Sequence, residues 1–276
     1  MKVNDSSNIL TFEQKSISPN ELKQIGVTHD IHDIAKNVVK INGKYYYSKI
    51  CTNRELINEL IGTYLCKLVG LDVVDYQIGI STNCTYSKHY YALSEIFYRN
   101  NYFYSTVRDY FDMIPDDTRV YSDGIDSFFN CETSVLDMVN DKELEEAVLK
   151  MTSVDMKMGQ IDRHNYNVML RLAMNGKVEL EKLYDFGCAY DDDPPYPEFY
   201  CYDNPFLIVI KNFFSLNRLA SRYPYIIRCA KLLSDIPLYD VLKEIEKRFS
   251  LSIEDKDITG YLDMDKEFSK VLRKLR

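Results

Sequence analysis

Two Asn-Gly dipeptides constrain the fold of this chain more than any other feature. Asn42-Gly43 and Asn175-Gly176 each lie between runs of β-forming residues. Asn and Gly tolerate the positive φ angles that tight hairpin turns require, so each dipeptide predicts an antiparallel hairpin. The expected strands are residues 38–41 with 44–50, and residues 168–172 with 178–183.

A long helix is expected directly after the first hairpin. Thr52 and Glu55 have the spacing of a capping box, and Gly70 lies where the C-terminal cap of the helix belongs. Between them, apolar residues recur at helical spacing. These apolar residues are Ile57, Leu60, Ile61, Tyr64, Leu65 and Leu68. Residues 73–80 and 90–97 have the composition of two further strands.

The remainder of the chain is predicted to be mainly helical. The pattern predicts helices over residues 141–158, after Pro237 and from Asp255 onward, the last as a solvated amphipathic helix. A short helix is expected to begin after Ser18. The predicted fold class is therefore α+β, with a small antiparallel sheet and one long helix in residues 1–97 and a mainly helical part in residues 98–276.

Composition excludes several classes of protein. The 276 residues carry a formal charge of −8, which argues against a protein that coats nucleic acid or an anionic membrane by charge. The 10 glycines form neither a GxGxxG dinucleotide loop nor a Walker-A loop. The longest strongly apolar stretch, residues 206–210, is too short to span a bilayer.

Cysteine usage and the N-terminus favour a cytoplasmic location. The seven cysteines are odd in number and lack metal-ligand spacing, so reduced thiols are expected rather than a disulfide framework or a zinc site. The first ten residues have no apolar core of a secretory signal.

The segment with the clearest chemistry runs from Asp162 to Asp185. A helix is expected to end near Gly159, a polar loop with Asp162 and Asn167 follows, and the second hairpin leads to Asp185. These three side chains can therefore converge at one end of the hairpin. A carboxylate near a hydroxyl acceptor, with an amide and a second carboxylate as oxygen ligands, suits Mg²⁺-dependent phosphoryl transfer.

The first hairpin and the following helix supply a lysine and a glutamate. Lys49 near the end of its strand and Glu59 on the helix have the order of the kinase phosphate-positioning pair. Lys44 competes with Lys49, and Glu55 competes with Glu59. Glu55 is already explained by the capping box, so Lys49 and Glu59 are the favoured pair.

At these positions the sequence resembles the protein-kinase-like superfamily and, within it, the HipA-like kinases. The resemblance rests on D-R-H-x-x-N at residues 162–167, on Y-D-F-G at residues 184–187, and on Asn58-Glu59 followed by Leu68-Val-Gly-Leu71. The first two motifs are also typical of phosphoinositide kinases. The resemblance covers residues 38–190 in ordered motifs.

The resemblance implies a two-lobed fold, divided at residues 1–97 and 98–276, and a role for each matched residue. Asp162 would accept or orient the proton of the attacking hydroxyl, and Asn167 and Asp185 would hold Mg²⁺. Lys49 would contact the ATP phosphates, and Glu59 would hold Lys49. The remaining predicted contacts are backbone groups offered to adenine by Glu95, Ile96 and Phe97.

The predicted function is that of an ATP- and Mg²⁺-dependent kinase acting on Ser or Thr of a protein, with autophosphorylation as one form of it. A phosphoinositide or small-molecule kinase on the same fold is one alternative, and a pseudokinase that acts as an interaction module is another. A secreted or host-delivered effector is a further alternative to the cytoplasmic location. Without a glycine-rich loop, the phosphates must be covered by other residues, for which 26–33 are the candidates.

Overall fold

The computed structural model describes residues 2–3, 9–13, 15, 17–24, 37–83, 90–96, 101–115, 139–160, 163, 167–187, 189 and 223–274. Asp162, Phe97 and the candidate covering segment 26–33 lie outside these residues. The predictions that concern them therefore stay predictions.

The first predicted hairpin is the edge of a five-stranded sheet. Asn42 and Gly43 both have positive φ, at 50° and 83°, as a two-residue hairpin turn requires. In the sheet β2 pairs parallel with β5, and all other neighbours are antiparallel. The strand order is β2 (Leu10–Phe12), β5 (Tyr76–Ser81), β6 (Tyr90–Glu95), β4 (Lys44–Cys51) and β3 (Val38–Ile41).

Helix α3 (Asn53–Leu68) begins and ends as its sequence predicts. The Thr52 hydroxyl accepts a hydrogen bond from the Glu55 N–H at 3.2 Å, and the Glu55 carboxylate accepts one from the Thr52 N–H at 2.6 Å. Gly70 follows the helix with a φ of 73°, a left-handed conformation that favours glycine.

The strand expected at residues 73–80 begins later, at Tyr76. Val73 instead forms an isolated parallel bridge with Leu183, and the Val74 N–H donates to the Leu183 carbonyl at 2.9 Å. Residues 73–74 therefore contact the segment before Asp185 rather than the five-stranded sheet.

The second hairpin lies in a three-stranded sheet whose third member was not predicted. β7 (Tyr102–Thr106) pairs with β8 (Met169–Ala173), which pairs with β9 (Val178–Leu180). The turn is a loop of three residues closed by Ala173 and Lys177, in which Gly176 has a φ of 84°. The aromatic run of β7 obscured the alternation that marks a strand, because Tyr102 and Tyr104 lie on one face and Phe103 lies on the other.

Helices make up most of the described chain after residue 107. Helix α6 ends at Gly159, which has a left-handed φ of 57°, as expected. A short pairing of β1 (Lys2–Val3) with β10 (Leu251–Ser252) joins the N-terminus to the C-terminal region. The helices are α1 (Pro19–Gln24), α4 (Val107–Met113), α6 (Lys142–Met158), α9 (Tyr223–Ser234), α10 (Leu238–Phe249) and α11 (Asp255–Lys274).

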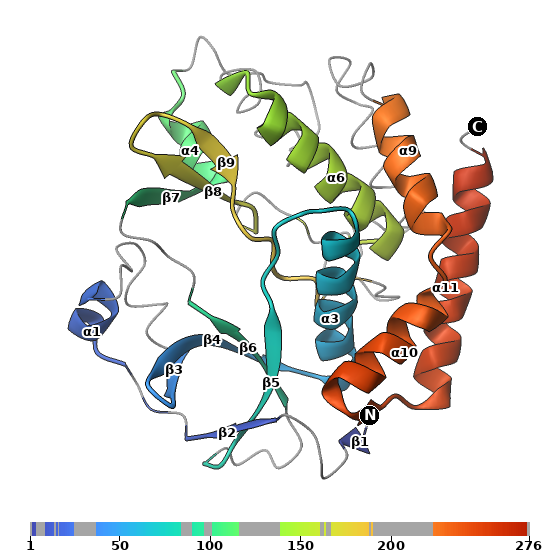
Figure 1. Ribbon diagram of the computed structural model, residues 1–276, viewed down its shortest axis with the longest axis horizontal. Helices are drawn as coiled ribbons and strands as arrows, with labels where there is room; N and C mark the ends of the chain where they lie inside the picture. Colours follow the sequence, from blue (N-terminus) through green and yellow to red (C-terminus); the bar gives the residue numbers. More distant parts are fainter. Residues whose placement is uncertain are drawn as a thin grey trace, which may run out of the picture.

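Helix α3 lies between the five-stranded sheet and the C-terminal helices (Figure 1). One hydrophobic cluster includes residues of α3, α6, α10 and α11. The expectation of a solvated C-terminal helix is wrong for one face of α11, because Tyr261, Phe268 and Leu272 are buried. That face packs against α6, α9 and α10.

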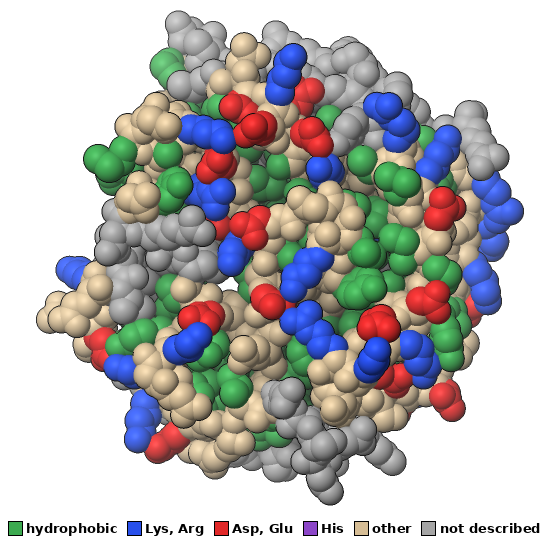
Figure 2. Space-filling view, in the orientation of Figure 1, with side chains coloured by type: hydrophobic (Ala, Val, Ile, Leu, Met, Phe, Trp, Pro, Cys, Tyr) green, Lys and Arg blue, Asp and Glu red, His purple; other side chains and the backbone are tan. Residues whose placement is uncertain are grey.

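The surface mixes charges of both signs. On the face drawn in Figure 2, acidic and basic side chains are interspersed. No helix in the described part of the chain is long and apolar enough to cross a membrane.

Candidate active site

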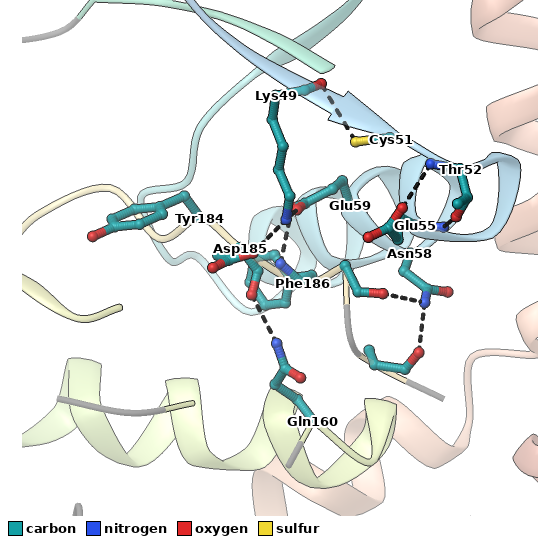
Figure 3. A network of polar contacts seen from close by, with 12 residues as sticks. Lys49, Cys51, Thr52, Glu55, Asn58, Glu59, Gln160, Tyr184, Asp185 and Phe186 are labelled. Atoms are coloured by element: carbon teal, nitrogen blue, oxygen red, sulfur yellow. Dashed lines mark hydrogen bonds and ion pairs between the residues drawn. The ribbon is translucent and has the colours of Figure 1, made fainter. Parts of the chain in front are cut away.

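Lys49 on β4 joins two carboxylates that are far apart in the sequence. Its Nζ lies 2.7 Å from Glu59 Oε1 on α3, and it also bonds to Asp185 Oδ1 (Figure 3). Lys44 instead pairs with Glu95 at the exposed surface, with Nζ 2.9 Å from Oε2. Of the two candidate lysines, it is therefore Lys49 that meets the helix glutamate.

The Glu59 carboxylate is fully buried and has a partner for each oxygen. Oε1 accepts from Lys49, and Oε2 accepts from the Phe186 N–H at 2.9 Å. Burial by itself lowers the pKa of Lys49, but the Glu59 and Asp185 carboxylates outweigh it and raise that pKa above its ordinary value. Lys49 therefore stays an ammonium ion at neutral pH.

Asp185 has an unusual backbone conformation that its neighbours hold in place. Its φ is 62°, in the left-handed region that costs a non-glycine residue about 1–2 kcal/mol. The Gln160 amide donates to the Asp185 carbonyl at 2.7 Å, and Glu59 accepts from the next N–H, that of Phe186. Gln160, just beyond α6, and Glu59, within α3, thus fix both polar groups of the peptide that follows the Asp185 Cα.

Arg163 supports the same segment from the other side. Its guanidinium is buried and binds both oxygens of the Asp155 carboxylate, at 3.1–3.3 Å. A further N–H donates to the Tyr184 carbonyl at 2.7 Å, and the guanidinium lies 4.6 Å from the Phe186 ring centroid. The Asp155 carboxylate raises the pKa of Arg163 against the opposing effect of burial.

Asn167 is brought to the same end of the second hairpin as Asp185. Leu170 pairs with Leu180, and the Glu181 N–H donates to the Met169 carbonyl at 2.8 Å. One arm of the hairpin therefore leads back to Asn167 and the other leads on to Asp185. Asn167 is buried, whereas the Asp185 side chain is 31% exposed.

The donor set at this end suits Mg²⁺. An amide oxygen and a carboxylate oxygen are the hard ligands that Mg²⁺ accepts, and phosphate oxygens and water complete its shell. Within the described residues, the Asp185 carboxylate bonds to Lys49 through Oδ1. No group of three His, Cys, Asp or Glu side chains that could hold a metal converges among the residues that the structure describes.

The predicted adenine contacts are only partly placed. Glu95 ends β6, and its side chain pairs with Lys44. The Ile96 N–H donates to the Tyr45 carbonyl at 3.0 Å, so this N–H belongs to the sheet and is not free for adenine. Asp162 and Phe97 lie outside the described residues.

Several residues that shape the site were not predicted from the sequence. Gly62 on α3 faces the Phe186 ring, and Tyr76 on β5 is buried beside Glu59, where desolvation and that carboxylate raise its pKa well above the ordinary value. Gln160 donates to the carbonyl of Asp185, and Arg163 donates to the carbonyl of the residue before it, Tyr184. The only sequence signal for Arg163 was its place in D-R-H-x-x-N, and Gly62 carried none.

The chain resembles known proteins in its fold, although comparison of its sequence found no match. No family model matches the sequence. No curated protein matches it either. The proinflammatory kinase CtkA of Helicobacter pylori superposes with a TM-score of 0.53 at 15% identity, covering 84% of this chain and 89% of that chain. The HipA protein of Shewanella oneidensis, solved with HipB and operator DNA, superposes with a TM-score of 0.52 at 12% identity. That match covers 99% of this chain and 73% of HipA.

The chain has the fold of the HipA-like kinases. This confirms the resemblance that D-R-H-x-x-N and Y-D-F-G predict. The HipA-like fold also accounts for the mixed α/β architecture, in which a sheet and α3 approach a mainly helical region.

Proposed function

We propose that this chain is an ATP- and Mg²⁺-dependent kinase that phosphorylates a Ser or Thr hydroxyl of a protein. The observation that carries the proposal is the ammonium group of Lys49 bonded to both Glu59 and Asp185. A strand lysine held by a helix glutamate beside a metal-binding aspartate is what kinases use to position the phosphates. The HipA-like fold supports the same conclusion.

Each residue of the site then has a task. Lys49 contacts the ATP phosphates, and Glu59 keeps its ammonium in place. Asn167 and Asp185 hold Mg²⁺, which supplies positive charge to the transferring phosphoryl group when it is bound. Asp162 accepts the proton of the attacking hydroxyl as the new P–O bond forms and the bond to the ADP oxygen breaks.

The charge of the chain favours a protein acceptor over a phosphoinositide. A phosphoinositide head needs a concentration of basic residues, whereas the chain carries a net charge of −8 and mixes both signs on the face shown in Figure 2. An acidic kinase is better suited to a protein hydroxyl than to an anionic membrane surface.

The decisive experiment uses labelled ATP with the full chain. The wild type, Asp162→Ala and Asp185→Asn are incubated with γ-labelled ATP and Mg²⁺, alone, with a cell lysate and with phosphoinositide vesicles. We expect labelled protein in the wild type and a loss of at least about 100-fold in both variants. Asp263→Asn is the matched control, because that carboxylate is exposed on α11 and pairs with Lys266 on the same helix.

The outcomes separate the alternatives. Label in the vesicles alone would replace the protein acceptor by a lipid, and nucleotide binding without any transfer would make the chain a pseudokinase. Full activity in Asp185→Asn would remove that residue from the metal site.

A further inference from the structure

The C-terminal helix reaches the candidate active site through one hydroxyl group. Tyr261 on α11 is 3% exposed, and its hydroxyl lies 2.7 Å from Oδ1 of Asn58 on α3. The two residues are 203 positions apart in the sequence. Asn58 is itself buried, and it directly precedes Glu59.

The hydrogen bonds of Asn58 have a defined direction. Its Nδ2 donates to the Gly187 carbonyl at 2.8 Å and also to the Ala189 carbonyl (Figure 3). Carbonyls only accept, so the amide nitrogen must face them and the amide oxygen must face Tyr261. The Tyr261 hydroxyl is then the donor, and it holds the Asn58 amide in the orientation that binds the two carbonyls.

The segment that Asn58 holds lies against Lys49. Gly187 is two residues after Asp185, and a Cβ on Gly187 would lie 2.9 Å from Lys49 Nζ and 3.5 Å from Glu59 Oε1. The space where a side chain of residue 187 would begin is therefore occupied by the ammonium group that joins Glu59 to Asp185.

A second contact keeps α11 in register with the site. Asp265, one turn after Tyr261, pairs with Lys157, whose side chain is fully buried in the last turn of α6. Lys157 Nζ also lies 4.8 Å from the Phe268 ring centroid, and the Leu238 N–H donates to Asp265 Oδ2 at 3.1 Å. Residues 261, 265 and 268 share one face of the helix, so rotation of α11 would break both contacts together.

We propose that Tyr261 is a positioning residue of the candidate active site, which it acts on through Asn58 and the backbone of Gly187 and Ala189. Through Tyr261, the C-terminal helix α11 helps to order the segment that follows Asp185. This inference rests on the proposed kinase function for its catalytic consequence, but the ordering of residues 184–189 can be measured without it.

The test removes the hydroxyl alone. Tyr261→Phe is compared with Tyr239→Phe, which deletes the hydroxyl of a half-exposed residue on α10. We expect Tyr261→Phe to lower kcat about tenfold, as the loss of one buried hydrogen bond allows, with KM for ATP changed less than about threefold. Tyr239→Phe should leave both constants unchanged. A change in KM for ATP with kcat unchanged would overturn the proposal. An equal fall in kcat in both variants would also overturn it.

Amide hydrogen exchange gives a readout that does not need activity. In Tyr261→Phe the exchange of residues 184–189 should rise about tenfold while exchange in α6 and α10 stays at the wild-type rate. Faster exchange confined to α11 would mean a purely local role and would overturn the proposal. An inactive wild type with the expected local exchange would refute the kinase function while sustaining the positioning role.

A double-mutant cycle tests the route through Asn58. Asn58→Asp keeps an oxygen toward Tyr261 but removes the donors to Gly187 and Ala189. If Tyr261 acts through Asn58, adding Tyr261→Phe to Asn58→Asp should cause no further increase in exchange at residues 184–189. Additive increases would show that Tyr261 acts by another route.

Discussion

The Lys49 ammonium group is surrounded by specific neighbours on three sides. It has carboxylates on two sides and the Gly187 backbone on a third. Gly187 has no need of a left-handed φ, so what glycine contributes here is the absence of a Cβ. The lysine and this glycine therefore depend on each other for their positions.

Substitution of Gly187 by alanine should impair activity far more than folding. The new Cβ would lie 2.9 Å from Lys49 Nζ, and the flexible end of a lysine can move aside at small cost. We expect labelled-ATP turnover to fall at least about tenfold, and the free energy of unfolding to change by less than about 1 kcal/mol.

Gly260→Ala is the control for this substitution. Gly260 lies within α11 with nothing within 4 Å of an added Cβ, so alanine should stabilise the helix by about 1 kcal/mol. Turnover should not change. Equal turnover in Gly187→Ala and the wild type would show that the position of Lys49 is not critical.

At the scale of elements, α3 connects the sheet with the segment that carries Asp185. Glu59 and Asn58 are consecutive on this helix and bind opposite ends of residues 186–189. One turn later in the helix, the Phe186 ring packs against the backbone at Gly62, where no Cβ is present. The helix is therefore specified by its contacts with a distant segment as well as by its own caps.

Gly62→Ala should destabilise the protein although alanine is the better helix former. A Cβ at Gly62 would lie 2.3 Å from Phe186 Cγ, and the ring is fully buried. The overpacking should cost about 1–3 kcal/mol beyond the helix-propensity gain of about 1 kcal/mol. Urea unfolding followed by circular dichroism measures the difference. An unfolding midpoint above that of the wild type would contradict this packing.

At the scale of the whole molecule, Asp75 ties three elements together. It lies one residue before β5, and its carboxylate binds Lys67 of α3 at 2.8 Å and Arg248 of α10 at 2.7 Å. Burial raises the pKa of Asp75, but the hydrogen bonds from Lys67 and Arg248 outweigh it and lower the pKa below the ordinary value of 3.8. The C-terminal helices are thus joined by charge to the part of the chain that forms the sheet.

This pair of contacts predicts a pH dependence of stability. Because the pKa is lower in the folded protein, the stabilisation is present above about pH 4 and is lost as the pH falls through the folded-state pKa. Asp75→Asn should lower the free energy of unfolding by about 0.5 kcal/mol at pH 7, since solvent screens this half-exposed carboxylate. The difference from the wild type should shrink toward zero near pH 3 in urea titrations.

Asp112→Asn serves as the comparison, because Asp112 pairs with Arg108 one turn away on the same helix, α4. A deficit of Asp75→Asn that stays constant from pH 7 to pH 3 would show that the charge is not the cause.

Local features of the fold were predictable because their causes lie within a few residues. The Asn42-Gly43 turn, the Thr52–Glu55 capping box and the Gly159 cap all depend on contacts between near neighbours. Where the prediction was wrong, a distant segment intervened. Val73 pairs with Leu183 and is therefore not part of the strand expected at residues 73–80. One face of α11 is buried because α6, α9 and α10 pack against it.

The sequence by itself determined the hairpins, the long helix and the order of Lys49, Glu59, Asn167 and Asp185 along the chain. Only the tertiary structure decided that Lys49 rather than Lys44 meets Glu59, and that Gly62, Gln160, Arg163 and Tyr261 serve the segment around Asp185. The physical reason is separation: Lys49 and Asp185 lie 136 residues apart and Asn58 and Tyr261 lie 203 apart. Caps and turns are specified by nearby residues, whereas the partner of a buried polar group is settled only when the whole chain packs.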